Sequence, residues 1–172
     1  FAKKYGIEIK QVITPKRYDV KNPFVDGWPV VERKMVQVLL RNPKDDTYLF
    51  LKWKNQTWVT FVGGGIDEGA DVHSAALREL QEEAGISNVT FVKKLSVVRS
   101  EYSANHKQQN RVAYCEALVF DTNDSTVFDK VSGDEQAQYE VFWGKITALP
   151  KEFVCSEWDV WQSEIINNFP KG

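Results

Sequence analysis

The stretch that decides the fold is Gly63–Ile86, GGGIDEGADVHSAALRELQEEAGI. Three glycines lead through an acidic turn into a segment whose apolar residues recur at helical spacing. Asp71 is placed to cap a helix that runs from about Val72 to Ala84, and Gly85 suits the left-handed position after a helix. The spacing therefore predicts a helix with a stop signal at each end.

Three carboxylates of this predicted helix lie close together. Glu79, Glu82 and Glu83 fall within an arc of about 100° on a helical projection. Like charges at this spacing repel one another, and a divalent cation that takes oxygen ligands would relieve the repulsion. The alternative is a solvated acidic face, as on most glutamate-rich helices. The glycines before the helix and Gly85-Ile86 after it favour the metal site.

The composition is that of one globular domain. The chain has 172 residues, of which 42% are hydrophobic and 27% are charged. A net charge of -2 argues against nucleic-acid binding by this domain alone. The two cysteines and the absence of a secretory segment favour a cytoplasmic protein, and no apolar run is long enough to cross a membrane.

Alternating and apolar runs predict a mixed α/β domain. Strands are expected at 32–41, 47–52, 57–61, 89–101, 111–120 and 138–145. The first two form a hairpin, loops cover 102–110 and 121–136, and an amphipathic helix covers 156–169. We treat residues 1–33 as an N-terminal extension, a candidate remnant of a host domain, and residues 34–172 as the main domain.

The central stretch resembles the Nudix box. The matching positions are Gly64, Arg78-Glu79-Leu80, Glu82-Glu83 and Gly85-Ile86, which are eight of the nine that define the box. The resemblance covers roughly residues 34–168. It implies the Nudix-type α/β/α sandwich with a mixed β-sheet. It also implies divalent-metal-dependent hydrolysis of a nucleoside diphosphate linked to another moiety.

One box position departs from the pattern, because Ala70 stands where the family has its first glutamate. That glutamate would normally brace Arg78 and the metal site. Glu68 and Asp71 are close in sequence, but neither occupies the same position. Ala70 has three readings: tolerance in an active enzyme, loss of hydrolysis in a binding protein, or an engineered substitution that traps substrate.

The resemblance assigns the remaining box residues to the chemistry. Glu79, Glu82 and Glu83 are the expected ligands of Mg²⁺ (or Mn²⁺), and Arg78 is the residue that orients them. Three glutamates are candidates for the general base: Glu82 within the box, and Glu135 or Glu140 later in the chain. For Glu135 and Glu140 the alternative is ordinary surface polarity.

The substrate, a nucleotide diphosphate-type small molecule, is expected to contact residues on both sides of the box. Gly63 and Gly64 would allow the close approach of a ligand. Cations that could meet the phosphates, with surface charge as the alternative, are Arg99, Lys107 and Arg111. Aromatic residues that could stack on a base, with core packing as the alternative for the first two, are Trp58, Phe61 and Tyr102.

The first thirteen residues, FAKKYGIEIKQVI, are similar to a stretch near the end of the editing domain of bacterial-type leucyl-tRNA synthetases. Chance similarity competes with this reading because the segment is short. Together with Phe1 in the first position, it suggests a fragment of a larger protein. The second functional hypothesis is therefore a catalytically inactive Nudix-fold binding or insertion module.

Overall fold

The computed structural model describes residues 16–96, 98–123, 138–153, 161–162 and 164–166. Residues 1–13, which carry the synthetase-like stretch, and the candidate base Glu135 lie outside this part, as does the side chain of Arg99. The elements of the described part are β1 (Lys16–Tyr18), β2 (Val30–Asn42), β3 (Thr47–Trp53), β4 (Val59–Thr60), β5 (Val62–Gly65), α1 (Val72–Ala84), β6 (Thr90–Lys94), β7 (Arg99–Ala104), β8 (Asn110–Asp121), β9 (Tyr139–Lys145) and the 3₁₀ helix η2 (Ile146–Ala148).

The strands form a mixed sheet in the order β1-β7-β8-β2-β3-β4, with β5 on β2, β6 on β8 and β9 on β3. Its centre is the parallel pair β2 and β8, in register from Val30 opposite Asn110 to Arg41 opposite Asp121. The neighbouring pairs β2–β3, β2–β5 and β7–β8 are antiparallel. The predicted mixed sheet and the hairpin of β2 and β3 are therefore confirmed.

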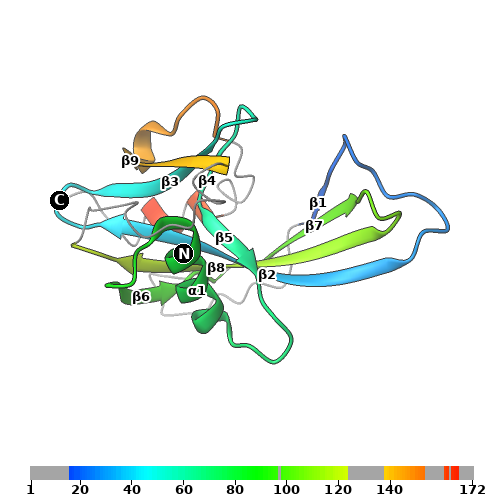
Figure 1. The fold of residues 1–172 in the computed structure, drawn as a ribbon, viewed down its shortest axis with the longest axis horizontal. Coiled ribbons are helices and arrows are strands. Elements are labelled where there is room, and N and C mark those ends of the chain that lie inside the picture. Colours follow the sequence, from blue (N-terminus) through cyan, green and yellow to red (C-terminus); the bar gives the residue numbers. More distant parts are fainter. Residues whose placement is uncertain (1–15, 97, 124–137, 154–160, 163, 167–172) are drawn as a thin grey trace, which may run out of the picture.

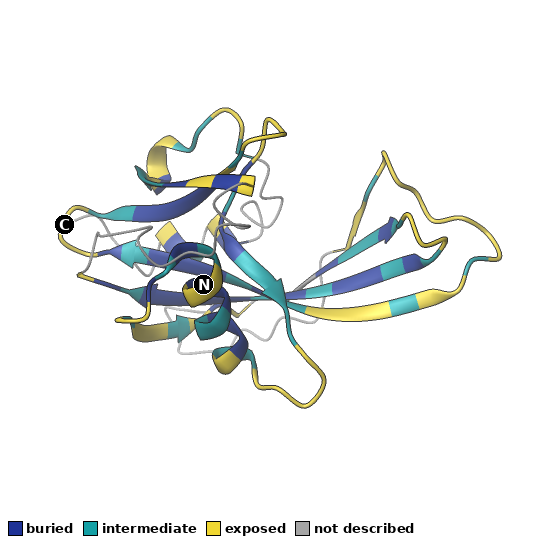
Figure 2. Ribbon diagram, in the orientation of Figure 1, coloured by how far each residue is buried: buried dark blue, intermediate teal, exposed yellow. Residues whose placement is uncertain are grey.

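Part of the sheet projects beyond the helix as an arm (Figure 1, right). We define the arm as β1, β7 and the paired first halves of β2 and β8, residues 30–34 and 110–114. Figure 2 shows that the first half of β2 in the arm is largely exposed, whereas the arm parts of β7 and β8 are buried or intermediate. The arm thus lies outside the two apolar clusters of the body, but its inner strands are themselves partly buried.

Two apolar clusters lie on opposite faces of β2, as the alternation of side chains along a strand requires. Val36, Val38 and Leu40 pack in the cluster that includes the apolar residues of α1. Met35 and Leu39 belong to the second cluster, which is completed from the C-terminal part of the chain by Trp161 and Ile165. The described residues at 161–162 and 164–166 are helical. Helical segments thus cover both faces, as expected for an α/β/α sandwich.

The structure corrects the predicted bounds of two strands. The expected strand over 89–101 is two strands, and Tyr102–Ala104, expected in a loop, continues β7 because it pairs with the start of β8. The turn is confined to residues 105–109, where Asn105 Oδ1 accepts hydrogen bonds from the backbone N–H groups of Lys107 and Gln109. None of the helices described here is long and apolar enough for a membrane span.

Candidate active site

Helix α1 begins and ends where its sequence predicts. The carboxylate of Asp71 accepts hydrogen bonds from the backbone N–H groups of His73, at 2.9 Å, and Ser74, at 3.0 Å. The Ser74 hydroxyl also donates to Asp71, and these hydrogen bonds lower the pKa of that carboxyl. Gly85 follows the helix with φ 67°, in the left-handed region. The caps fix where the box glutamates sit along the helix.

The three glycines form strand β5 and pack directly against α1. They pair with β2, where Gly63 lies opposite Gln37 and Gly65 opposite Met35. A Cβ atom on Gly64 would lie 2.3 Å from the carboxyl carbon of Glu79, so the carboxyl group occupies the space that a side chain would need. Glu79 is only 7% exposed as a result. The glycines are therefore part of a strand and do not form a tight turn.

The other box residues are tied to the same strand. The backbone N–H of Gly63 donates to Glu83 Oε2 at 2.9 Å. Arg78 Nη2 donates to the carbonyl oxygen of Gly65 at 2.7 Å and lies 2.9 Å from Glu79 Oε1. Its Nη1 lies 3.2 Å from Glu82 Oε2. Arg78 therefore contacts two of the three glutamates, and its orienting role stays a prediction.

The loop before α1 offers a different carboxylate near the position of the missing glutamate. Asp67 Oδ2 lies 3.9 Å from Arg78 Nη2, and the carbonyl of Asp67 accepts a hydrogen bond from the N–H of Ala70 at 3.0 Å. Its side chain is 82% exposed, so the ion pair is weak. Asp71 is engaged as the helix cap and does not take over the brace. Asp67 was not considered from the sequence because it lies three residues before the box position.

The donor chemistry of the box fits a divalent metal, since carboxylates are the ligands that Mg²⁺ and Mn²⁺ prefer. No group of three acidic, histidine or cysteine side chains within the described ranges is gathered closely enough to hold an ion. Glu79 and Glu82 pair with Arg78, and Glu83 accepts from Gly63. Metal binding would therefore require Arg78 to share or release these carboxylates.

Residues predicted to contact substrate are spread along the chain and do not all meet at the box. Cys115 of β8 is level with Gly65 of β5, because both are opposite Met35 of β2. Arg111 lies four residues before Cys115, so it is roughly 13 Å along β8 from the level of Gly65, at about 3.3 Å per residue. Tyr102 stacks on Tyr18 in the arm, with ring centroids 5.0 Å apart.

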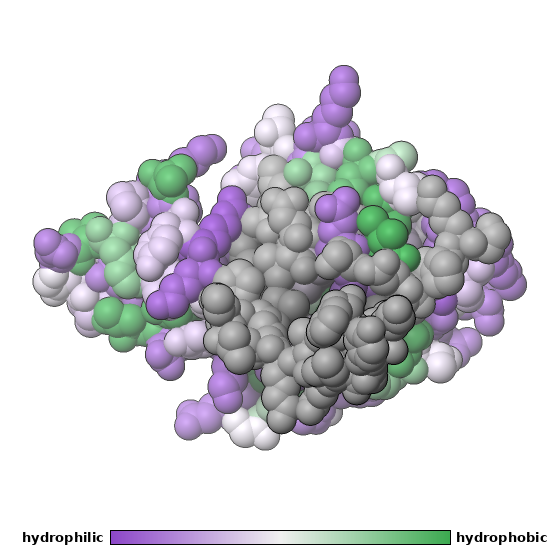
Figure 3. Space-filling model, turned by 180° about the vertical axis from the view of Figure 1, so that it is seen from behind, coloured by the Kyte–Doolittle hydropathy of each residue, from purple (hydrophilic) through white to green (hydrophobic). Residues whose placement is uncertain are grey.

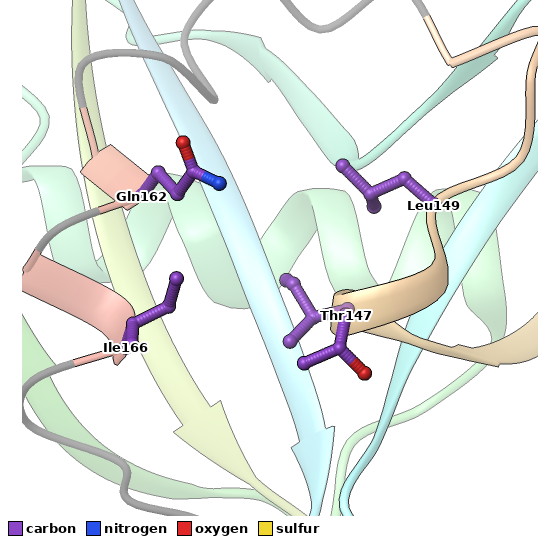
Figure 4. A pocket seen from close by; sticks show the side chains of 5 residues that line it. Thr147, Leu149, Gln162 and Ile166 are labelled. Carbon is purple, nitrogen blue, oxygen red and sulfur yellow. The ribbon is translucent and has the colours of Figure 1, made fainter.

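The remaining candidates also lie apart from the box. Trp58 precedes β4 and is 45% exposed, whereas Phe61 is buried in the core, as the alternative reading had it. Glu140 is opposite Lys52 in the β3–β9 pair and lines a pocket of about 320 Å³ that includes no box residue. A second pocket, of about 330 Å³, lies between η2 and the C-terminal helical residues and is lined largely by apolar side chains (Figure 4).

The cation that does lie at the box is Arg33, which sequence reasoning missed. A Cβ atom on Gly65 would lie 2.6 Å from Arg33 Nη2, so the guanidinium group rests over this glycine. Strand alternation places Arg33 on the face of the sheet opposite the one that Glu79 contacts. The signal in the sequence was a charged residue in an apolar strand, but its relation to Gly65 depends on the register of β2 and β5.

The NUDIX domain family model matches residues 31–168. The chain therefore belongs to the NUDIX domain family. No curated protein sequence matches it. Among solved structures, the MutT NUDIX hydrolase from Burkholderia pseudomallei is similar, with a TM-score of 0.55 and 20% identity over 77% of this chain and 97% of that one.

A second similar structure is the E. coli ORF135 protein in solution, with a TM-score of 0.51 and 15% identity over 87% of this chain and 99% of that one. At these identities the two structures establish the fold. The family match and the fold together confirm the resemblance of the box and the Nudix-type sandwich, and they support a hydrolase.

Proposed function

We propose that the protein is a divalent-metal-dependent hydrolase that cleaves a nucleoside diphosphate linked to another moiety. The observation that carries this proposal is the arrangement around Arg78, which joins two box glutamates to the carbonyl of Gly65. A purely structural helix has no need of an arginine that holds two glutamates of its own helix and a carbonyl group of the neighbouring glycine strand. The alternative, a surface acidic face, does not explain a buried Glu79.

Glu79, Glu82 and Glu83 would hold the metal. A bound Mg²⁺ or Mn²⁺ would neutralise charge on the diphosphate and lower the pKa of a coordinated water. Arg78 holds the carboxylates of Glu79 and Glu82 in place, and such supporting contacts commonly set metal affinity. Because Gly64 has no side chain, the carboxyl group of Glu79 lies directly against the strand.

Two side chains have further roles in this proposal. Arg33, over Gly65 on the face of the sheet opposite Glu79, would meet a phosphate oxygen of a substrate part that reaches that face. Glu82, whose side chain is 53% exposed, is the candidate general base within the box, because an exposed carboxylate is accessible to a water molecule. Glu135 and Glu140 stay as predicted alternatives, although Glu140 lines a pocket apart from the box.

The test is release of phosphorylated products from a panel of nucleoside diphosphate derivatives, with Mg²⁺, with Mn²⁺ and with a chelator. The assay compares the unsubstituted protein, which has Ala70, with the variant Ala70→Glu. We expect metal-dependent turnover that rises about tenfold or more in Ala70→Glu, because the restored carboxylate braces Arg78. Lys44→Gln, in the exposed turn between β2 and β3, is the control for a general loss of activity.

No turnover in either protein, with folding verified, would contradict the proposal. That result would favour the second hypothesis, a Nudix-fold binding or insertion module. Calorimetry with Mn²⁺ separates the two outcomes further, since a hydrolase site binds the ion and loses that binding in Glu79→Gln.

A further inference from the structure

The two faces of the arm differ in chemistry. Tyr18 and Tyr102 stack on each other, and strand register and alternation place them on the same side of the sheet as α1. The opposite face carries arginines from three strands: Arg17 of β1, Arg33 of β2 and Arg111 of β8. Seen from behind, strongly hydrophilic side chains lie where the arm joins the body (Figure 3). We call the face of the arm that carries these three arginines the basic face.

Two polar groups of the basic face are buried and have no hydrogen-bond partner among the residues that the structure describes. Ser103 and Arg111 are directly opposite each other in the β7–β8 pair, so their Cβ atoms are about 5 Å apart. Ser103 is 3% exposed, and within the described ranges neither its Oγ nor the Nε of Arg111 has a partner. Buried polar atoms are nearly always hydrogen-bonded. Two adjacent donors without an acceptor indicate a position that a ligand acceptor completes.

The chemistry of these donors selects an anion with several acceptor oxygens. A guanidinium group and a hydroxyl group together suit phosphate, which arginine binds through paired N–H groups. On the described basic face, three arginines (Arg17, Arg33 and Arg111) and one glutamate (Glu101) leave two positive charges. A phosphomonoester carries about -1.5 to -2 at neutral pH, which matches this balance.

The basic face is continuous with the box. Arg111 is opposite Val31 in the β2–β8 pair, so Arg33, two residues further along β2, is its diagonal neighbour. The guanidinium group of Arg33 in turn lies over Gly65, whose carbonyl accepts from Arg78. A substrate held at the box would reach Arg111 past Arg33, on the face of the sheet opposite the one that Glu79 contacts.

We propose that the basic face binds a phosphomonoester that the substrate carries outside its diphosphate, with Arg111 and Ser103 donating to the phosphate oxygens. The substrate class is then a nucleoside diphosphate derivative with an additional terminal phosphate. The identity of the substrate rests on the proposed function. The phosphate site itself rests on the arm alone.

The test measures binding without catalysis, in a metal-free buffer with a chelator. Calorimetry compares adenosine 3′,5′-bisphosphate with adenosine 5′-monophosphate. We expect the bisphosphate to bind about tenfold more tightly, since a hydrogen bond to a charged group has about this effect. Arg111→Gln should remove that difference, Arg111→Lys should retain part of it, and Ser103→Ala should reduce it about threefold.

Lys16→Gln is the matched control, because it removes one positive charge from the other face of the same arm. It should leave both affinities within about twofold of the starting values. Equal binding of the two nucleotides to the unsubstituted protein would overturn the proposal. So would an equal loss for both nucleotides in Arg111→Gln.

A direct measurement does not depend on any variant. The Nε–Hε NMR resonance of Arg111 should shift and saturate as inorganic phosphate is added, and should not shift with chloride at the same ionic strength. If the resonance does not shift with phosphate, the proposed phosphate site is wrong. The hydrolysis test and the binding measurements are independent of each other. Phosphate binding without turnover would contradict the proposed function and would leave the phosphate site standing.

Discussion

Gly64 and Glu79 share a space that holds either a carboxyl group or a methyl group, but not both. A Cβ atom on Gly64 would lie 2.3 Å from Glu79 Oε1, far inside contact distance. Gly64 is not among the glycines with positive φ, so its requirement here is steric and not conformational. The glycine of the box is thus a condition for burying the glutamate.

We expect Gly64→Ala to displace the carboxyl group of Glu79. Activity and metal affinity should fall about 10–100-fold, as when a supporting contact of a metal ligand is lost. The free energy of unfolding should fall by about 1–3 kcal/mol, the usual cost of overpacking. Kinetics and urea denaturation measure the two effects.

The control for this prediction is the same change in a Glu79→Ala background. The added methyl group then meets no carboxyl group, so Gly64→Ala should cost less than half as much stability there. An equal cost in both backgrounds would show that the steric conflict with Glu79 is not the cause.

At the scale of elements, helix α1 was predictable and strand β5 was not. The bounds of α1 depend on local signals, the cap at Asp71 and the glycine at 85, and both are confirmed. Consecutive glycines have low strand propensity, so Gly63–Gly65 gave no local sign of a strand. Their hydrogen bonds come from β2, and only the tertiary pairing explains why they are extended.

The C-terminal helical residues are attached to β6 by one carboxylate, which makes this contact sensitive to pH. Glu164 lies 2.9 Å from Lys93 Nζ and accepts hydrogen bonds from the N–H of Ser96 at 2.8 Å and its hydroxyl at 2.7 Å. Burial alone would raise the pKa of Glu164, but the hydrogen bonds from Lys93 and Ser96 outweigh it and lower the pKa below the usual value.

A lowered pKa in the folded state means that Glu164 stabilises the fold above its unfolded pKa, near 4.3. The contribution should be lost as pH falls through the still lower folded value. At neutral pH, Glu164→Gln should reduce the free energy of unfolding by about 1–3 kcal/mol. Thermal unfolding from pH 7 to pH 3 measures this, and a difference between the two proteins that persists at the lowest pH would contradict it.

At the scale of the whole molecule, the candidate site was predictable only as far as the helix reaches. Glu79, Glu82, Glu83 and Arg78 follow from spacing along one element. The positions of Arg33, Arg111 and the other proposed substrate contacts depend instead on how β2, β5, β7 and β8 align. No local pattern states a register, so nothing in the sequence indicated that Arg33 lies over Gly65 or how far Arg111 lies from the box.

The outer strands of the sheet should unfold first and its central strands last. Backbone amides of Val38–Leu40 and Leu118–Phe120, buried in the central pair, should exchange hydrogen only through global unfolding, at about 5–15 kcal/mol. Amides of β1, which pairs with β7 alone and is exposed, should exchange far faster. Native-state hydrogen exchange measures both, and equal protection of β1 and β2 would contradict this expectation.

The parallel pairing of β2 with β8 also bears on how the chain is made. Arg41 and Asp121, which close this pair through two hydrogen bonds of 2.9 Å, are 80 residues apart in the sequence. At a synthesis rate of about 5–20 residues per second, the apolar run of β2 waits roughly 4–16 seconds for its partner. During that interval Val36–Leu40, a segment of high β-propensity, has its β8-facing edge unpaired, and such open edges promote aggregation. The strand at the centre of the finished sheet is therefore the one that most needs protection on the ribosome.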